Sequence, residues 1–285
     1  MSVSWDDLSD ILIAKEEDQT NNNLVLIDGV NLAFRYLQRA NYASYSDDYI
    51  RTVTSLGKSY KAKRVICCFD SGASTYRKNI FPEYKDNRKV ERTQEEQDRF
   101  TAFFNCLNET IDQLPVEHFK FKGIEADDTI AYFTKHLAPK YDHTWVISSD
   151  RDLFQLLRSN VSIFNIYSRK EISEASLLET HELTPKEYAF SRMIEGDTGD
   201  NIRGIDGIGP KRAAALVKEY KTLDNLISNL PIKGKAKYIQ NLNAGIDTLL
   251  LNEKLINLVN YNKHIIDTSD NSENTNAILA KALTI

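Results

Sequence analysis

Nine acidic residues carry the strongest chemical signal in this sequence, because they end short apolar runs or lie in compact acidic motifs. They are Asp28, Asp70, Glu125, Asp127, Asp128, Asp150, Asp152, Asp197 and Asp200. Asp28, Asp70 and Asp150 each follow a run that reads as a strand, and the carboxyl ends of parallel strands meet at one edge of a sheet. Like charges gathered there would raise one another's pKa, and hard divalent cations such as Mg²⁺ relieve that repulsion. The pattern predicts a metal-dependent phosphoryl-transfer enzyme.

Each acidic motif also has a simpler structural explanation when it is taken alone. Glu125-Ala126-Asp127-Asp128 begins a predicted helix, where acids are common because they complement the helix dipole. Asp150 and Asp152 follow a strand, as many turn residues do, and Asp197 and Asp200 lie beside glycines that suit a turn. Five acidic sites at five structural transitions favour one shared site over coincidence.

Length and composition indicate one large domain, or a core with a smaller appendage. The chain has 285 residues, of which 41% are hydrophobic and 27% charged. No apolar run approaches the roughly 18 residues that span a bilayer, and the acidic N-terminal segment lacks the features of a signal peptide. We therefore expect a cytoplasmic protein without a membrane partner. Cys67, Cys68 and Cys106 are expected as buried free thiols, and the histidines show no zinc-ligand spacing.

The net charge of −5 hides a locally basic region. Removing the nine negative charges listed above from −5 leaves the rest of the chain at +4. Between Arg203 and Gln240, eight basic residues accompany three acids. A basic face on an acidic protein indicates a nucleic-acid backbone as partner, with an ordinary solvated face as the alternative.

A glycine-rich turn lies inside this basic region, from Gly204 to Arg212 (GIDGIGPKR). It looks like a helix–hairpin–helix turn, in which glycine amides and a helix N-terminus hold a DNA phosphate. Pro210 suits the first position of the following helix. The glycine spacing excludes a dinucleotide-binding fingerprint and a P-loop. A packing corner between two helices is the alternative.

Strand and helix patterns alternate through the first two thirds of the chain, which predicts an α/β fold with a mostly parallel sheet and helices on both faces. The predicted strands are 24–28, 64–70 and 144–149, and the predicted helices are 46–61 and 125–138. An acidic helix is expected at 4–18, with a polar tether at 19–23. Strand signals fade after residue 185, and a polar spacer at 267–275 precedes the last helix.

The segment from Ser71 to Arg99 is rich in charge, with aromatic residues interleaved. Thr93 and Glu96 form a capping box, and apolar residues at helical spacing then indicate that the far half of this helix packs on the core. The start of the segment is too polar to be buried. We expect a solvated loop or a mobile element over the cleft.

Together these motifs resemble the flap endonuclease and 5′–3′ exonuclease family, most of all the small stand-alone 5′ nucleases of T-five-type bacteriophages. The matching stretches are Val25–Leu32, Phe81–Arg88, Glu125–Asp128, Gly196–Gly204 and Lys235–Asn243. The resemblance covers essentially the whole chain. It implies a PIN-like nuclease core at 1–185, which includes a helical arch at about 71–100. It also implies a helical DNA-binding region at 186–285, with a helix–three-turn–helix module around the turn at 204–212.

The resemblance also implies roles for individual residues. Asp28, Asp70, Glu125 and Asp127 would group around one Mg²⁺ or Mn²⁺ ion, and Asp128, Asp150, Asp152, Asp197 and Asp200 would serve a second, some through water. Lys85 and Arg88 would act on the scissile phosphate, and Tyr84 would stack on a base. Arg192 stands where phage relatives carry a lysine, and it is planar and bulkier. The DNA-binding residues would be Arg203, Gly207, Gly209, Lys211, Arg212, Lys235 and Lys237, and K⁺ is a candidate ligand at the glycine turn.

The implied protein is a monomeric, structure-specific 5′ nuclease that cleaves 5′ flaps, single-strand–duplex junctions and duplex 5′ ends of DNA during replication. Its setting would be the cytoplasm of a phage-infected bacterium, with replication proteins as candidate partners. The alternatives are a non-catalytic DNA-junction-binding protein, a phosphatase using Asp150 and Asp152, and a PIN-type ribonuclease. All nine acidic positions are filled, no nucleophilic Asp motif with its lysine is present, and the glycine turn and arch favour DNA junctions.

Overall fold

The computed structural model describes residues 21–37, 45–88 and 92–284. The acidic helix expected at residues 4–18 lies outside the described residues. The expected tether at 19–23 is wrong for its last three residues, because they pair with neighbouring strands and begin β1 (Asn21–Asp28).

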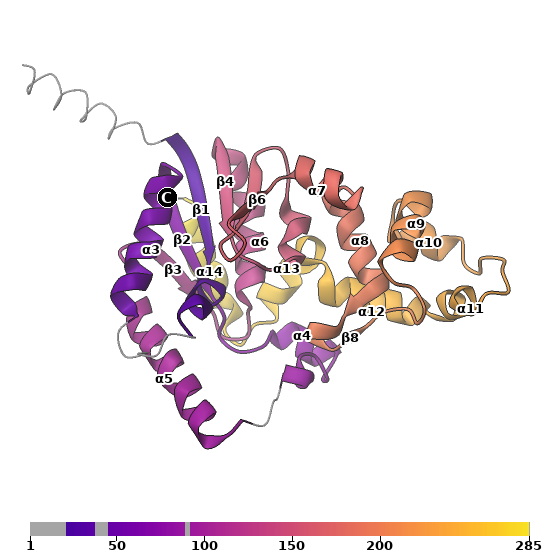
Figure 1. The fold of residues 1–285 in the computed structure, drawn as a ribbon, viewed down its shortest axis with the longest axis horizontal. Coiled ribbons are helices and arrows are strands. Elements are labelled where there is room, and N and C mark those ends of the chain that lie inside the picture. The colour runs from indigo at the N-terminus through magenta and orange to yellow at the C-terminus, as the bar shows by residue number, and fades with distance from the viewer. Residues whose placement is uncertain (1–20, 38–44, 89–91, 285) are drawn as a thin grey trace, which may run out of the picture.

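A six-stranded sheet forms the centre of the molecule (Figure 1). Its strands are β1, β2 (Ala62–Phe69), β3 (Glu117–Lys120), β4 (His143–Ile147), β5 (Val161–Asn165) and β6 (Lys170–Ile172), in the order β3-β2-β1-β4-β5-β6. All neighbours are parallel except β5 and β6, which confirms the mostly parallel sheet. The strand order reverses between β1 and β4, and such a switch point opens a crevice at the carboxyl ends of the strands.

Helices cover both faces of the sheet, as expected. Successive residues of a strand point to opposite faces, so Leu24 and Leu26 of β1 pack in one apolar cluster and Val25 and Ile27 in another. The second cluster is covered by α2 (Gly29–Ala33), α3 (Ser46–Ser59) and α5 (Gln94–Ile111). The first is covered by α6 (Ala126–His136), α8 (Pro185–Glu195) and the C-terminal helices. The three cysteines are buried and free.

The polar segment after β2 is partly buried, contrary to expectation. It contains α4 (Thr75–Ile80), a 3-10 turn η3 (Asp86–Arg88) and α5, whose Thr93–Glu96 capping box is present as predicted. Arg77 and Tyr84 are each only 2% exposed. Their polarity did not prevent burial because each side chain bonds to buried carboxylates.

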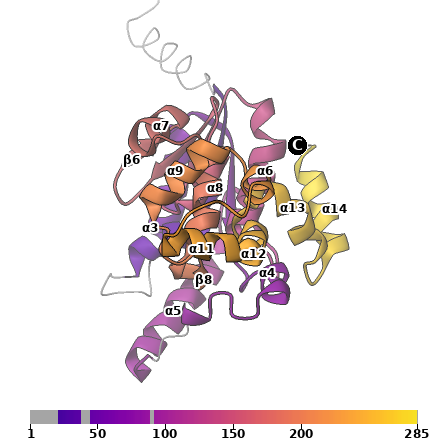
Figure 2. The same ribbon diagram turned by 90° about the vertical axis from the view of Figure 1, so that its right-hand side faces the viewer.

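Beyond α8, the chain is mainly helical. A two-stranded ribbon, β7 (Gly196–Asp197) and β8 (Ile202–Arg203), is followed by α9 (Pro210–Tyr220), α10 (Leu223–Ser228), α11 (Lys237–Ala244), α12 (Ile246–Ile256), α13 (Leu258–Asp267) and α14 (Ser272–Ala282). Figure 2 shows α9 and α11 in front of the core, with α13 and α14 beside α6. The last helix begins inside the spacer expected at 267–275. None of the described helices is long and apolar enough to cross a membrane.

Candidate active site

Asp28 lies at the switch point, where β1 ends and α2 begins. Its carboxylate accepts hydrogen bonds from the Asn31 amide at 3.1 Å and from Ser148 Oγ at 2.9 Å. Asn31 also bonds to Ser149 through its side chain, so the ends of β1 and β4 are joined. Burial, and then the nearby negative charge of Asp70, raise the pKa of Asp28 to about 7. Keeping Asp28 ionised at this site therefore costs free energy.

Asp70, Glu125 and Asp127 meet at the N-terminus of α6. Asp70 accepts a hydrogen bond from the Ala126 amide at 2.9 Å. Burial, followed by the charges of Asp150, Asp28 and Asp70, raises the pKa of Asp127 well above its ordinary value. The pKa of Glu125 is lowered instead, because the nearby Lys85 and Arg77 outweigh its burial. These acids form one electrostatic group with Asp28.

Asp128 differs from its neighbours, because a buried cation neutralises it. Arg77 donates two hydrogen bonds to the Asp128 carboxylate, each 2.8 Å long, and a third to Glu125 at 3.0 Å. Its Nε donates to the Leu255 carbonyl, so all three guanidinium nitrogens have a hydrogen-bond acceptor. Both Asp128 oxygens are engaged and the residue is fully buried. The expected role of Asp128 at a second metal ion stays a prediction, and in this structure Arg77 engages both of its oxygens.

Asp150, Asp152 and Asp197 form the other side of the site, around Arg192. Asp152 begins the 3-10 turn η5 (Asp152–Leu156), and its amide donates to Asp150 at 2.8 Å. Arg192 bridges Asp152 at 3.2 Å and Asp197 at 2.8 Å. Burial and the charge of Asp150 raise the pKa of Asp152 to about 7, although Arg192 opposes this. The planar fork of Arg192 suits a bridge between two carboxylates, which a lysine could make only as a point charge.

Asp200 binds the two cations of the predicted arch. It forms ion pairs with Arg88 and, at 3.7 Å, with Lys85, whose Nζ also lies 2.5 Å from Glu125. Tyr84 Oη lies 2.9 Å from Glu125 and 3.1 Å from Asp200, so its single proton is shared between the two carboxylates. Because the Tyr84 ring is buried, it offers no face to a base in this structure. The stacking role expected for Tyr84 stays a prediction, and in this structure its hydroxyl contacts two carboxylates instead.

The segment that carries Lys85 and Arg88 is held in place by hydrogen bonds to residues 198–201, which lie far along the sequence. The Lys85 amide donates to the Asp200 carbonyl at 3.0 Å, with Lys85 in the left-handed region at φ +59°. Asn87 Nδ2 donates to the Thr198 carbonyl at 2.6 Å, and Asn201 Nδ2 donates to the Glu83 carbonyl at 2.8 Å. Sequence reasoning missed Arg77, Asn87 and Asn201, because their partners lie 48 or more residues away and follow no motif.

The charge balance of the site favours divalent cations. Arg77, Lys85, Arg88 and Arg192 are four cations among nine carboxylates, so a formal count with every acid ionised leaves five negative charges uncompensated. Within the described residues, no three His, Cys, Asp or Glu side chains converge as a ready-made metal site. The cations and backbone amides occupy the carboxylate oxygens instead. An all-oxygen donor set with raised pKa values nevertheless fits hard ions such as Mg²⁺.

The glycine turn and the loop before α11 form one exposed basic surface. Gly207 has φ +82°, and a Cβ there would lie 3.2 Å from that of Tyr238, so the close approach requires glycine. Arg212 stacks on the Tyr238 ring and donates to the Gly207 carbonyl at 2.6 Å. Around Gly209, at the start of α9, the space is open. The remaining predicted contacts, Arg203, Lys211, Lys235 and Lys237, are exposed.

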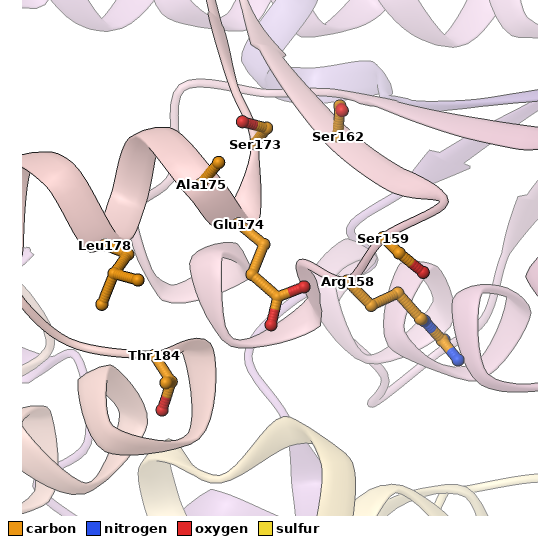
Figure 3. Close-up of a pocket in the computed structure, with 8 residues that line it drawn as sticks. All are labelled: Arg158, Ser159, Ser162, Ser173, Glu174, Ala175, Leu178 and Thr184. Atoms are coloured by element: carbon orange, nitrogen blue, oxygen red, sulfur yellow. The ribbon is translucent and has the colours of Figure 1, made fainter.

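A separate pocket of about 340 Å³ lies beside α7 (Glu174–His181), as Figure 3 shows. Its charged lining residues are Arg158 and Glu174, and none of the nine carboxylates reaches it. A single cation facing a single carboxylate offers no basis for metal binding. The pocket is therefore distinct from the candidate active site.

Comparisons with known proteins agree with this geometry. Residues 23–183 match the family model of the 5′-3′ exonuclease N-terminal resolvase-like domain, and residues 183–275 match the 5′-3′ exonuclease C-terminal SAM fold. The chain is 38% identical to the flap endonuclease of Escherichia phage T5, over 92% of this chain and 91% of the relative. It is 30% identical to the 5′-3′ exonuclease of Bacillus subtilis, over 82% of each.

A solved structure of the bacteriophage T5 flap endonuclease with DNA and metal ions has the same fold. It superimposes with a TM-score of 0.87 at 35% identity, and the match covers 92% of this chain and all of that one (100%).

We expect Arg77→Met to destabilise the protein by about 3–5 kcal/mol, because it leaves Asp128 and Glu125 buried without their cation. Urea unfolding would measure the change. Adding Asp128→Asn to the variant removes one of the stranded charges and should restore part of the loss. A double variant no more stable than Arg77→Met would contradict the pairing.

Removing one charge from the crowded acids should stabilise the metal-free protein. In EDTA, Asp127→Asn should raise the free energy of unfolding by on the order of 1 kcal/mol, because a shift of one pKa unit corresponds to about 1.4 kcal/mol. Asp247→Asn removes an exposed charge on α12 and serves as the control. Equal effects of the two substitutions would show that Asp127 is not strained by its neighbours.

Proposed function

The chain belongs to the 5′–3′ exonuclease family, and on that premise we propose a residue-level account of its action as a flap endonuclease and 5′–3′ exonuclease on DNA. The observation that carries the proposal is the meeting of buried carboxylates with the cations Lys85 and Arg88 at one sheet edge. Together with the exposed basic surface at the glycine turn, this arrangement matches the needs of phosphodiester hydrolysis on DNA.

Two divalent ions, Mg²⁺ or Mn²⁺, are proposed to bind at the carboxylates. Asp28, Asp70, Glu125 and Asp127 would hold the first, and Asp150, Asp152, Asp197 and Asp200 the second. When bound, such ions lower the pKa of an attacking water and stabilise the leaving oxygen. Asp128 is left out of both groups, because Arg77 engages its two oxygens. Arg77 would instead fix the first turn of α6, and with it the direction of Glu125.

Lys85 and Arg88 are proposed to exchange partners during the reaction. Without metal they neutralise Glu125 and Asp200. Ions bound at those carboxylates would replace them, so both cations become available to the scissile phosphate. There they would stabilise the charge that develops in the transition state. Arg192, which bridges Asp152 and Asp197, would by the same logic hold the second ion's ligands apart or contact the phosphate itself.

Duplex DNA is proposed to bind the glycine turn and the adjoining loop. Backbone amides near Gly207 and Gly209 and the side chain of Lys211 would contact phosphates, and Arg203, Arg212, Lys235 and Lys237 would add positive charge. A K⁺ ion at the turn could share such a phosphate. The nuclease core at 1–185, with its arch at about 71–100, would admit the single-stranded 5′ end, and the region 186–285 would hold the duplex. We expect a cytoplasmic monomer that acts with replication proteins.

Cleavage of a labelled 5′-flap DNA should require Mg²⁺ or Mn²⁺ and stop in excess EDTA. Asp150→Ala should abolish cutting while leaving junction binding within about twofold, since the residue is expected to serve the metal and not the DNA. Product mapping and gel shift would measure the two effects. Full cleavage in EDTA would overturn metal catalysis, and binding without any cleavage by the unaltered protein would favour a junction-binding protein.

The exchange of partners predicts an unusual effect on metal affinity. Lys85→Met should bind Mn²⁺ several-fold more tightly than the unaltered protein in calorimetry, because Nζ no longer competes for Glu125. The same variant should lose flap cleavage. Lys78→Met is the matched control, because Lys78 pairs with Asp86 outside the carboxylate group. Weaker Mn²⁺ binding by Lys85→Met would contradict the competition.

A further inference from the structure

A groove of about 800 Å³ lies outside the candidate active site, where α6, α8 and α13 meet the chain between α9 and α10 (Figure 1). Its floor is apolar and comprises Leu156, Leu157, Phe190, Met193 and Leu258. None of the nine carboxylates is among the described residues that line it. We propose that this groove binds the protein's own N-terminal segment, residues 4–18. The inference goes beyond the nuclease function proposed above and does not depend on it.

One side of the groove is positively charged. Lys135 and Lys186 line it, both are exposed, and neither forms a salt bridge with a described residue. Arg158 Nη2 donates to the Thr134 carbonyl of α6 at 2.7 Å, and burial lowers the pKa of Arg158. Two of the three acids in the lining belong to α10 and α12, so the side formed by α6, α8 and residues 155–158 keeps three cations against one acid, Glu174. Helices α8 and α13 also begin at the groove, and helix N-termini add partial positive charge.

The sequence of residues 4–18 complements such a surface. Six acids and one lysine give this segment a net charge of −5. Trp5, Leu8 and Leu12 recur at intervals of three and four residues, which is the spacing of one face of a helix, and Asp10 and Glu17 would fall on the opposite face. An amphipathic segment of this kind binds by laying its apolar face on an apolar groove. Its acids can then lie along the basic side.

The described chain begins close to the basic side of the groove. Asn22 Nδ2 donates to the Lys140 carbonyl at 2.9 Å, and the Asn22 carbonyl accepts from the Asp142 amide at 2.8 Å. Lys140 lies five residues after Lys135, which corresponds to roughly 8–10 Å along a helix. The four residue steps from Asp18 to Asn22 span up to about 14 Å. Asp18 can therefore reach Lys135, and the residues before it can follow the apolar floor.

The inner wall of the groove holds two parts of the candidate active site. Gln155 donates to the Asp152 carbonyl at 2.7 Å, and Asn262 donates to the Asp128 carbonyl at 2.7 Å. Both amide side chains line the groove. A segment bound there would shield these hydrogen bonds from water without contacting any of the nine carboxylates. Docking would therefore support the catalytic edge of the sheet and leave its ligands free.

The fluorescence of Trp5 tests the proposal. The chain has two tryptophans, Trp5 and Trp145, and Trp145 packs on the opposite face of the sheet. In full-length Trp145→Phe, Trp5 should emit at a shorter wavelength than in a free peptide of residues 2–18, and acrylamide should quench it several-fold less, because docking removes the ring from water. Adding Val259→Glu places a carboxylate in the groove and should expose Trp5. This acid lies in the first turn of α13, where it suits the helix dipole, so the variant should fold.

A matched control separates the groove from the rest of the surface. Leu250 and Val259 are each 40% exposed, but Leu250 lies outside the groove, so Leu250→Glu should leave the emission of Trp5 unchanged. Lys135→Glu/Lys186→Glu should expose Trp5, and high salt should do so in the unaltered groove because it screens the charges. If acrylamide quenches Trp5 of the full-length protein as strongly as it quenches the peptide, the segment does not dock. Equal changes in the two glutamate variants would overturn the assignment to this groove.

A second measurement shows whether the segment binds its own chain. Full-length Leu8→Asp/Leu12→Asp should leave the groove vacant and bind a labelled peptide of residues 2–18 with a dissociation constant of about 10–100 μM, because a short tether supplies an effective concentration of about 1 mM. The unaltered chain should bind that peptide about tenfold or more weakly, since its own segment competes. A Trp5 signal that depends on protein concentration would assign docking to neighbouring copies and overturn the proposal. Failure of the proposed nuclease function would show in DNA cleavage and would leave all of these readouts unchanged.

Discussion

The repulsion between carboxylates at one sheet edge is the constraint on which the rest of the structure depends. A parallel sheet with a switch point between β1 and β4 brings these groups together, and burial raises the pKa of several of them. The fold offsets this repulsion with positively charged side chains and with hydrogen bonds from backbone amides. Arg77 neutralises the buried part of the group. Lys85 and Arg192, at its rim, pair with carboxylates that would also bind the metal ions. Stability without metal and activity with metal therefore make opposing demands on the same oxygens.

The C-terminal helices support the catalytic centre directly. Asn262 of α13 donates to the Asp128 carbonyl at 2.7 Å, and Gln155 joins the Asp152 carbonyl to the start of α13. Asn252 of α12 donates to the carbonyls of Met193 and Arg203, which connects α8 to the ribbon before the glycine turn. These buried amide side chains bond to backbone groups. The main-chain positions that they fix therefore do not depend on the charge of the carboxylates. Asn252 therefore fixes α8, which carries Arg192, relative to β8, the strand that precedes the glycine turn.

Sequence patterns predicted the features that depend on local order. The strands that lead into Asp28 and Asp70 follow from hydrophobic periodicity, and the glycine turn follows from turn chemistry; the structure shows both, with β2 ending at Phe69. The short strands β3, β5 and β6 were missed, because three to five residues give too little periodicity. Burial of Arg77 and Tyr84 could not be predicted either, because polarity alone indicates exposure. Their carboxylate partners lie 41 to 116 residues away, and only the folded chain brings them together. The roles of the individual metal ligands stay predictions.

The long sequence separation of the contacts around Arg77 has a consequence for synthesis of the protein. Arg77 contacts the carbonyl of Leu255, 178 residues later, and Asp128 contacts Asn262, 134 residues later. Closing such loops is slow compared with local helix formation, and a ribosome adds residues from the N-terminus onward. The carboxylates are therefore translated long before the helices that align them emerge. A nascent chain that carries all nine acids still lacks the helices that align them, so we expect cutting activity only after α13 has been synthesised.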